Sequence, residues 1–342
     1  METEVKKIKT AVVGVGIFGE EHAAVYAEDE RVELAIVCDL NEKRAKEIGK
    51  KYNCSWTTKT GDIATNKEIE IVSIATPDFV HRDAAIEMAS SGKHIIVEKP
   101  LATTVQDAEA IISAAKKAKV KLMVDFHNRW NPPFVRAKEE IEKGNIGKPL
   151  MLSGKMSDRI EVATKWFKWS GKSGPHWFLF PHLIDLICWL TGEKVLDVYA
   201  IGKKEVLKKA GIDTYDLVQA MLKLENCFAT VETSWILPST WPSLIEFNLS
   251  VHGTEGRIDI DLTDQGLRIS GKNVYNMPFI SGKMEIYDRT HGFVPMPIKH
   301  FIGCVLKNKE PLVKPEEALL NVRIIEAITK SLQKGEVSFV KT

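Results

Sequence analysis

Short apolar runs alternate with helical patterns along the first third of the chain. The apolar runs, rich in β-branched residues, cover residues 8–13, 32–38, 70–75, 94–97 and 121–125. Helical patterns lie between them, at residues 18–28, 42–52, 79–91 and 104–118. Strands that alternate with helices in this order are typical of a parallel sheet covered by helices on both faces. We therefore predict an α/β domain with a doubly wound parallel sheet over residues 1–126.

After about residue 149 the pattern changes, because apolar runs follow one another with few helices between them. These runs cover residues 149–156, 195–204, 214–224, 227–236, 244–252, 256–262 and 266–270. A helix over 177–190 interrupts the start of the series, and helices return at 297–307 and 316–333. The pattern predicts a C-terminal α+β domain, residues 127–342, with a large, mostly antiparallel open sheet. Its last helices can pack back on the first domain.

Three glycines follow the first apolar run and open the first helix. Gly14 permits a tight turn, Gly16 lets the backbone approach a pyrophosphate, and Gly19 lets the helix pack closely on the strand. The start of the helix adds unpaired N–H groups and a partial positive charge. This context predicts a Rossmann dinucleotide-binding turn, in which Ile17 and Phe18 also line the cofactor.

An acidic residue ends the second strand. Asp39 lies 20 residues after Gly19, where a carboxylate can accept hydrogen bonds from an adenine ribose. The same charge repels a 2'-phosphate, and the next two residues bring no arginine to receive one, although Lys43 and Arg44 lie close. The sequence therefore favours NAD over NADP as the cofactor.

The fourth strand delivers Glu98, Lys99 and Pro100 to the sheet edge where ligands bind. A lysine there can hydrogen-bond a substrate oxygen, stabilise negative charge that develops on it, and help to relay a proton. A solvated Glu-Lys pair at a strand end is the plain alternative. The position at the ligand edge favours Lys99 as a catalytic residue that contacts substrate and cofactor, with Glu98 beside the cofactor.

The third and fifth strands end in further candidate residues. We expect Thr76 and Pro77 to line the adenine or pyrophosphate side of the cofactor. Asn128 can orient the nicotinamide amide or a substrate hydroxyl. For Arg129 the sequence gives equal weight to substrate binding and to a structural ion pair.

Composition restricts the classes of protein that the chain can belong to. Its 342 residues suffice for two domains, and a net charge of +1 with 27% charged residues implies no nucleic-acid or membrane partner. The first residues lack a signal peptide, so we expect a cytoplasmic protein. Five scattered cysteines without a C-x-x-C pair argue against a disulfide framework and a zinc site, and we expect no metal.

Several motifs together resemble the Gfo/Idh/MocA family of pyridine-nucleotide oxidoreductases. They are the stretches 14–19, 73–81, 92–101 with its Glu-Lys-Pro, 128–132, 144–149 and 315–318. The resemblance covers nearly the full length. It implies an N-terminal Rossmann domain, a C-terminal sheet that often mediates oligomerisation into dimers or tetramers, and oxidation or reduction at a carbon of a sugar, polyol or related compound.

The family usually carries a helix that reads D-x-x-x-H-x-x-D, with the histidine as acid/base. His182 and Asp185 match the histidine and the second acid, but Phe178 stands where the first aspartate belongs. The resemblance thus implies that His182 is catalytic and that the substrate differs from the usual one. His176 is a less favoured second base, because it can equally be a cap or a surface residue.

Aromatic residues precede this helix in unusual density. Trp166, Phe167, Trp169 and Trp177 could form core, or a wall that stacks on a sugar face. Asp158, at the end of the preceding strand, adds a polar group, so the sequence favours a substrate pocket over core packing for these aromatic residues. The predicted substrate-contacting residues are Lys99, Arg129, Asp158, Trp169, Phe178 and His182.

We expect an NAD-dependent dehydrogenase in which a carbinol carbon loses hydride, His182 takes the hydroxyl proton and Lys99 polarises the oxygen. A non-catalytic, NAD-linked sugar sensor is the main alternative, because the usual acid is missing at Phe178. A hydride-shuttling isomerase or hydrolase with bound NAD is the other.

Overall fold

The computed structural model describes residues 7–272, 274–287 and 289–341, and these form two units. The first unit runs to His127 and also includes Met284–Leu319, and the second comprises Asn128–Lys283 with the residues from Leu320 onward. The sequence pattern assigned residues 284–319 to the C-terminal domain. They lie in the first unit because they contact helix α1 and its end: the Thr290 N–H donates to Glu28 at 3.0 Å, and Arg31 donates to the Lys299 carbonyl at 3.1 Å.

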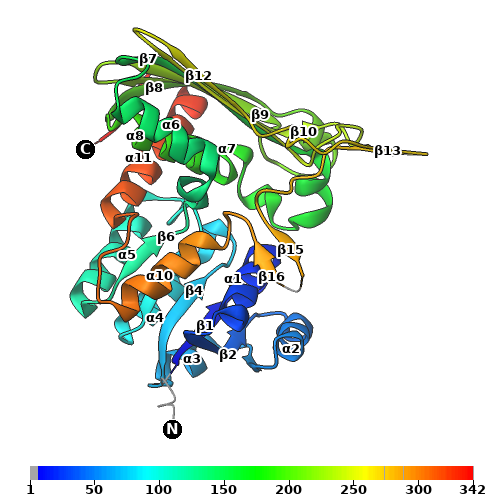
Figure 1. The fold of residues 1–342 in the computed structure, drawn as a ribbon, viewed down its shortest axis with the longest axis vertical. Coiled ribbons are helices and arrows are strands. Elements are labelled where there is room, and N and C mark those ends of the chain that lie inside the picture. The colour runs from blue at the N-terminus through cyan, green and yellow to red at the C-terminus, as the bar shows by residue number, and fades with distance from the viewer. Residues whose placement is uncertain (1–6, 273, 288, 342) are drawn as a thin grey trace. The chain divides into compact units, whose positions relative to one another are not determined.

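The first unit contains a six-stranded sheet in the order β3-β2-β1-β4-β5-β6, and every pair in it is parallel (Figure 1). Its strands are β1 (Ile8–Val13), β2 (Val32–Cys38), β3 (Ser55–Thr57), β4 (Ile69–Ile74), β5 (His94–Val97) and β6 (Leu122–Val124). This is the Rossmann strand order, in which ligands bind where the order reverses, beside β1 and β4. The predicted α/β, doubly wound fold is confirmed. The short β3 was not predicted, because three residues carry too little pattern.

Five helices connect these strands, and α10 belongs to the same unit. They are α1 (Ile17–Glu28), α2 (Glu42–Lys51), α3 (Thr60–Thr65), α4 (His81–Ser90) after the 3₁₀ turn η1 (Asp78–Val80), α5 (Val105–Ala118) and α10 (Met296–Leu306). Local capping explains several of their ends. The Asn41 and Thr104 side chains accept hydrogen bonds at the starts of α2 and α5, and Lys119 ends α5 in the left-handed region at φ 56°. A hairpin of β15 (Met284–Ile286) and β16 (Arg289–His291) precedes α10.

The second unit contains a seven-stranded sheet in the order β12-β11-β7-β10-β9-β8-β17. Its strands are β7 (Pro149–Arg159), β8 (Val195–Lys203), β9 (Leu217–Leu224), β10 (Phe228–Leu237), β11 (Ile245–Gly253), β12 (Arg257–Asp261) and β17 (Ser338–Phe339). Only the β7–β10 pair is parallel among these pairs, so the sheet is mixed and mostly antiparallel, as predicted. Burial alternates strictly along β9, which gives the sheet one inner and one outer face.

Helices and short elements complete the second unit. They are η2 (His127–Trp130), α6 (Pro132–Glu142), the π-helix η3 (Val162–Trp166), η4 (Ser170–Lys172), α7 (Pro175–Phe178), α8 (Phe180–Thr191), α9 (Val206–Lys209), and the hairpin β13 (Ile269–Gly271) and β14 (Val274–Asn276). Helix α11 (Pro315–Lys334) crosses the boundary between the units. Among the described residues, no helix has the length and apolar character needed to cross a membrane.

One predicted helix is divided in two. The pattern over 177–190 predicted a continuous helix, but α7 ends at Phe178 and α8 starts at Phe180, with Leu179 between them. Pro181 explains the break, because it lacks an N–H to continue the earlier helix but fits the first turn of a new one. The break places Phe178 and His182 on different helices.

Candidate active site

The three glycines of the N-terminal turn differ in what surrounds them. A Cβ on Gly14, whose φ is +82°, would lie 2.7 Å from the Ala75 carbonyl oxygen, and a Cβ on Gly19 would lie 1.8 Å from the Gly14 oxygen. The fold itself therefore requires these two glycines. A Cβ on Gly16 would meet nothing within 4 Å, so protein packing gives no reason for glycine there. That open side fits a pyrophosphate at the N-terminus of α1.

Asp39 is fixed beside this turn. Its Oδ2 accepts a hydrogen bond from the Val15 N–H at 3.0 Å, and its Oδ1 accepts from the Asn41 N–H at 2.8 Å. Arg44, the basic residue that could receive a 2'-phosphate, donates instead to the Val15 carbonyl at 2.8 Å and pairs with Glu20 and Glu47. Both arrangements fit NAD better than NADP.

The remaining predicted cofactor residues of the first unit lie at its strand ends. Ile17, at the start of α1, is 48% exposed, and the ring of Phe18 lies 5.4 Å from Lys99 Nζ. His81 joins the two neighbouring loops, because its ring nitrogens bond to the carbonyls of Thr76 and Pro100, each at 2.9 Å. Pro77 precedes the turn η1.

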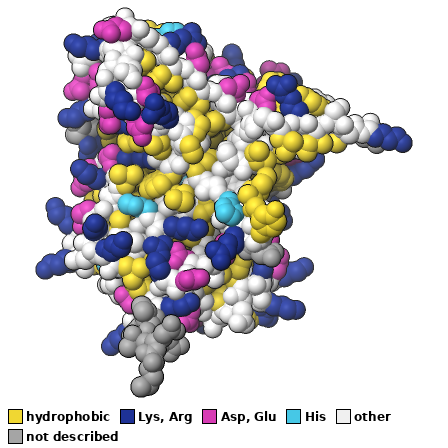
Figure 2. Space-filling view, in the orientation of Figure 1, with side chains coloured by type: hydrophobic (Ala, Val, Ile, Leu, Met, Phe, Trp, Pro, Cys, Tyr) yellow, Lys and Arg dark blue, Asp and Glu magenta, His cyan; other side chains and the backbone are white. Residues whose placement is uncertain are grey.

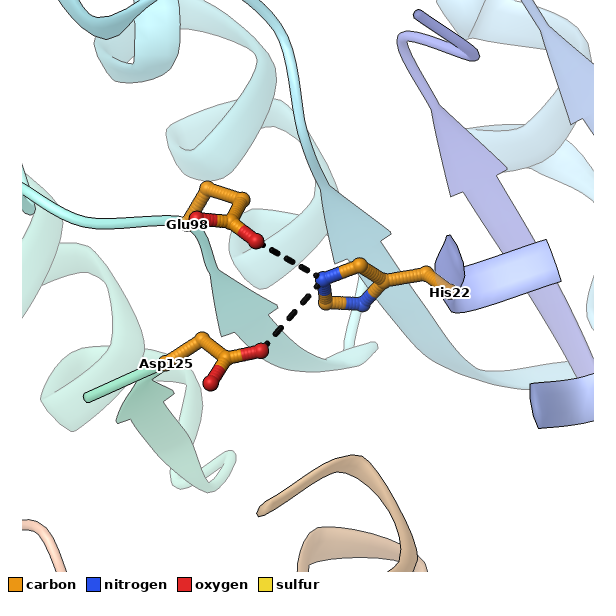
Figure 3. A group of neighbouring side chains, drawn as sticks. All are labelled: His22, Glu98 and Asp125. Carbon is orange, nitrogen blue, oxygen red and sulfur yellow. Dashed lines mark hydrogen bonds and ion pairs between the residues drawn. The ribbon is translucent and has the colours of Figure 1, made fainter. Parts of the chain in front are cut away.

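Lys99 is only 4% exposed and lies directly after β5. The neighbouring Glu98 belongs to a buried group with His22 and Asp125, shown in Figure 3. No sequence pattern indicates this group, because His22 comes from α1 and Asp125 directly follows β6. Buried charges near a candidate lysine affect both its position and its protonation.

In the second unit, the candidate base His182 is 4% exposed on α8. Its Nδ1 lies 3.2 Å from Nδ2 of Asn128, which also is buried. We predicted a cofactor contact for Asn128; the structure gives it a contact with the histidine, and the cofactor contact stays a prediction. An imidazole held on one ring nitrogen has a fixed orientation.

Arg129 makes the structural ion pair that the sequence left open. Its Nε and Nη2 donate to the carboxylate of Asp185 at 3.0 and 2.7 Å, and both side chains are buried. The bidentate geometry is typical of strong arginine–carboxylate pairs. Asp185 thereby holds α8 to the segment that carries Asn128.

An aromatic cluster surrounds Phe178. Its ring centroid lies 5.0 Å from that of Phe167, 5.7 Å from Trp235 and 6.2 Å from Trp169, and Phe167 stacks on Trp169 at 4.7 Å. Trp235, on β10, was missed in the sequence, where only its place in an alternating strand could have indicated it. Trp166 is 44% exposed and takes no part in these ring contacts.

Two other polar residues of this region are buried. Asp158, at the end of β7, is 2% exposed. The sequence left His176 open between a second base and a cap or surface residue; the structure excludes the surface position, because His176 is 5% exposed in α7, with its ring edge-on to Tyr215 at 5.6 Å. Burial, and to a lesser extent the charge of Lys204, lower the pKa of His176 to about 3, so its imidazole is neutral at neutral pH.

A Rossmann sheet with an open glycine turn and an acidic second-strand end, followed by an α+β unit, defines an NAD-binding oxidoreductase of two units. Family comparison agrees. Residues 8–126 match the oxidoreductase family with an NAD-binding Rossmann fold, and residues 134–259 match the GFO/IDH/MocA C-terminal domain. The chain belongs to the Gfo/Idh/MocA family of oxidoreductases.

Relatives and solved structures cover the chain almost completely. It is 28% identical to scyllo-inositol 2-dehydrogenase (NAD(+)) of Bacillus subtilis. The alignment of 336 residues covers 96% of this chain and 95% of that protein. It is 28% identical to 2,7-anhydro-N-acetylneuraminate hydratase of Escherichia coli, over 78% of this chain and 71% of that one. The structure of scyllo-inositol dehydrogenase from Lactobacillus casei with NAD(H) and scyllo-inositol has the same fold, with a TM-score of 0.84 at 20% identity over 98% of this chain and 100% of that one.

Proposed function

We propose that the protein is an NAD-dependent dehydrogenase that oxidises a carbinol carbon of a cyclic polyol or sugar. One observation carries the proposal: the side of Gly16 is open, and the carboxylate of Asp39 is held beside it by the Val15 N–H. An open glycine beside an anchored carboxylate is the arrangement that a dinucleotide requires at the first turn of a Rossmann sheet. The match over 95% of the length of scyllo-inositol 2-dehydrogenase supports the substrate class.

The roles of the protein's own residues follow from their chemistry. Gly16 and the first N–H groups of α1 would hold the pyrophosphate and Asp39 the adenine ribose, and NAD, when bound, would accept hydride from the carbinol carbon. Lys99 would hold the substrate oxygen and stabilise charge on it. His182 would take the hydroxyl proton on Nε2, which requires that Nδ1 carry the hydrogen and donate it to the side-chain oxygen of Asn128; the Asn128 amide would keep the ring in place.

Phe178 supports a substrate with a less polar face at this position. The ring is 9% exposed and packed against Phe167, Trp169 and Trp235, so it places an apolar side chain where the family pattern has a carboxylate. Aromatic faces stack on the C–H side of sugar and polyol rings. We therefore favour a ring compound whose hydroxyl pattern leaves one face apolar.

The similarity to a hydratase favours a second candidate reaction. That relative matches 78% of this chain at the same identity as the dehydrogenase. A hydride that is taken up and returned within one turnover would give a product without net NADH. This candidate uses the same Lys99 and His182, so it differs from the first only in what accumulates.

We further propose a homo-oligomer formed through the outer face of the second-unit sheet. Five large apolar side chains on β8, β9 and β10 are between 38% and 57% exposed: Tyr199, Ile201, Leu217, Met221 and Phe228. Tyr199 and Met221 are directly paired across the two strands. A contiguous exposed apolar area of this kind is typical of an interface. Sedimentation of the wild type and of Met221→Glu would test it, because a charge there should yield monomers.

We expect this enzyme in the cytoplasm, where its cofactor is used. The five cysteines are all free, which suits a reducing compartment. Figure 2 shows basic and acidic side chains scattered together over the face in view, consistent with the near-zero net charge and with a small-molecule substrate.

The function is tested by incubating the protein and NAD with scyllo-inositol, myo-inositol, other sugars, sugar acids and nucleotide sugars. NADH formation is followed by absorbance and product formation by mass spectrometry. NADH with one compound class supports the dehydrogenase, and a new product without NADH supports the hydride-returning reaction. A panel without product, combined with tight NAD binding, would establish the non-catalytic sensor instead.

A further inference from the structure

A chain of buried polar side chains runs through the first unit to the end of strand β5. Tyr26 Oη lies 2.7 Å from Ser73 Oγ, which lies 2.8 Å from His22 Nδ1. His22 Nε2 lies 3.2 Å from Glu98 Oε1 and 3.5 Å from Asp125 Oδ2 (Figure 3). None of the five side chains belongs to a residue more than 7% exposed. Helix α1 is thus joined to the ends of neighbouring strands of the sheet.

The chain of contacts ends on the backbone of Lys99. The second carboxylate oxygen of Glu98, Oε2, accepts a hydrogen bond from the Lys99 N–H at 3.2 Å. Oε1 of the same carboxylate contacts His22 of α1, so Glu98 joins helix α1 to the peptide N–H of Lys99. A shift of Glu98 would therefore move the start of the Lys99 side chain.

The two carboxyl groups differ in how readily they ionise. Burial raises the pKa of Asp125 well above its usual range, and the charge of Glu98 raises it further. Burial also acts to raise the pKa of Glu98, but the hydrogen bond and the charge of His22, together with the charge of Lys99, lower it to about 2. Glu98 is therefore the anion of the pair, and Asp125 keeps its proton to a higher pH than an ordinary aspartate does.

We propose that His22 and Asp125 are positioning residues for Lys99. His22 orients the carboxylate of Glu98, and Asp125 occupies the other contact of the same ring nitrogen without adding a second charge. Glu98 then holds the Lys99 backbone and supplies the counter-charge of its ammonium group. The inference rests on the proposed catalytic role of Lys99, and it names what holds that lysine in place and keeps it charged.

Isosteric amides at the two carboxyl groups test this assignment, because they should act differently. Glu98→Gln removes the anion and replaces one acceptor oxygen by an NH₂ group, which cannot accept from His22 or from the Lys99 N–H. We expect kcat to fall at least about 30-fold with KM within about threefold, measured with the panel compound that the wild type converts. Asp125→Asn, a neutral group of the same shape, should restore most of the activity that Asp125→Ala loses.

The pH profile separates positioning from general damage. Among the described residues, Glu98 after β5 and Asp125 and His127 after β6 interact electrostatically with Lys99, while His22 contacts Glu98 and Tyr26 interacts with Asp125. An ammonium that loses its counter-charge gives up its proton more readily. In Glu98→Gln the alkaline limb of kcat should therefore move to lower pH, whereas Glu70→Gln, at an exposed site on β4, should leave it in place. A uniform fall of kcat at every pH would overturn the proposal.

Infrared spectroscopy needs no substrate, so its outcome is independent of the proposed function. At neutral pH the wild type should show the C=O stretch of a buried protonated carboxyl group. Carboxyl-¹³C labelling of aspartate should shift this band, labelling of glutamate should not, and Asp125→Asn should abolish it. A band that shifts when glutamate is labelled, or that persists in Asp125→Asn, contradicts a protonated Asp125 even if Lys99 proves catalytic.

A divalent cation is the competing explanation of the group. The ligand atoms of His22, Glu98 and Asp125 lie within 4.8 Å of one another, a spacing that a metal ion would also suit. Metal binding needs both carboxyl groups ionised, so both isosteric amides would then be equally damaging. Elemental analysis of the purified protein should find well below one metal atom per chain. A stoichiometric metal that is lost in His22→Gln would overturn the proposal.

Discussion

The two units place their candidate functional residues in different ways. In the first unit the candidate residues follow the ends of strands. The carboxylate of Asp39 accepts from the Val15 N–H in the glycine turn, and that of Glu98 accepts from the N–H of the next residue, Lys99. In the second unit Asn128 and His182 are 54 residues apart, and Arg129 and Asp185 are 56 apart. The first unit therefore takes the positions of its candidate residues from strand topology, and the distant contact of His22 with Glu98, 76 residues apart, lies behind them. The second unit depends on pairs of distant side chains at the candidate residues themselves.

This difference predicts different responses to substitution. A change at a strand end in the first unit should remove one chemical function and leave the fold intact. A change in a buried pair of the second unit should also lower the free energy of unfolding, because the remaining partner is left buried without a hydrogen bond or counter-charge.

Lys99→Met should give the largest loss of activity. The methionine fills similar space but cannot stabilise charge on the substrate oxygen, so we expect kcat to fall at least about 10³-fold. NAD affinity, measured by titration of the protein fluorescence, should stay within about twofold, since the Gly16 turn and Asp39 are unchanged. Activity above a tenth of the wild-type value would exclude Lys99 as a catalytic residue.

Asp185→Asn should destabilise the protein by about 3 kcal/mol, because it leaves the buried guanidinium of Arg129 without its counter-charge. Urea unfolding measures the loss. The double variant Arg129→Met with Asp185→Leu should recover part of it, because no charge is then buried. Full stability of Asp185→Asn together with lost turnover would instead make Asp185 catalytic and remove the contrast between the units.

Gly16→Val and Gly19→Ala should separate ligand binding from folding within one turn. A side chain on Gly16 enters open space, so the melting temperature should hold while NAD affinity falls about 100-fold. A Cβ on Gly19 collides with the Gly14 carbonyl, so that variant should lose stability. Gly61→Ala, where a Cβ meets only a side-chain oxygen at 3.8 Å, is the matched control. Normal NAD binding by Gly16→Val would contradict the assigned cofactor turn.

Acidification should destabilise both units through buried histidines. Burial lowers the pKa of His127 to about 4 and that of His176 to about 3, so below pH 6.5 the unfolded chain binds protons that the folded chain does not. Stability therefore rises with pH in this range, and each histidine removes up to about 1.4 kcal/mol for every pH unit below 6.5.

His176→Phe should weaken that pH dependence, since a phenyl ring keeps the packing and takes up no proton. Urea midpoints at pH 7 and pH 5 measure it for the wild type, His176→Phe and His127→Phe. An unchanged slope in His176→Phe would show that the folded protein protonates this residue near its ordinary pKa.

The sequence predicted the first unit more completely than the second. Alternating strands and helices give a strong pattern, and β1 and β2 were predicted with the bounds that the structure has. Candidate residues at strand ends followed from the topology of a parallel sheet. In the second unit the strands of the large sheet were predicted except for the two-residue β17, and the run at 266–270 belongs to the separate β13–β14 hairpin. The break at Leu179 depended on how Pro181 is accommodated between two helices.

By itself, the sequence determined the fold class, the glycine turn, Asp39 and the position of Lys99, because these depend on local patterns and on strand order. Only the tertiary structure decided that Arg129 pairs with Asp185, that Asn128 contacts His182, and that His22 and Asp125 meet at Glu98. The physical reason is that the energy of a buried polar group depends on its partners. Those partners come from segments far apart in the chain, and no local pattern specifies them.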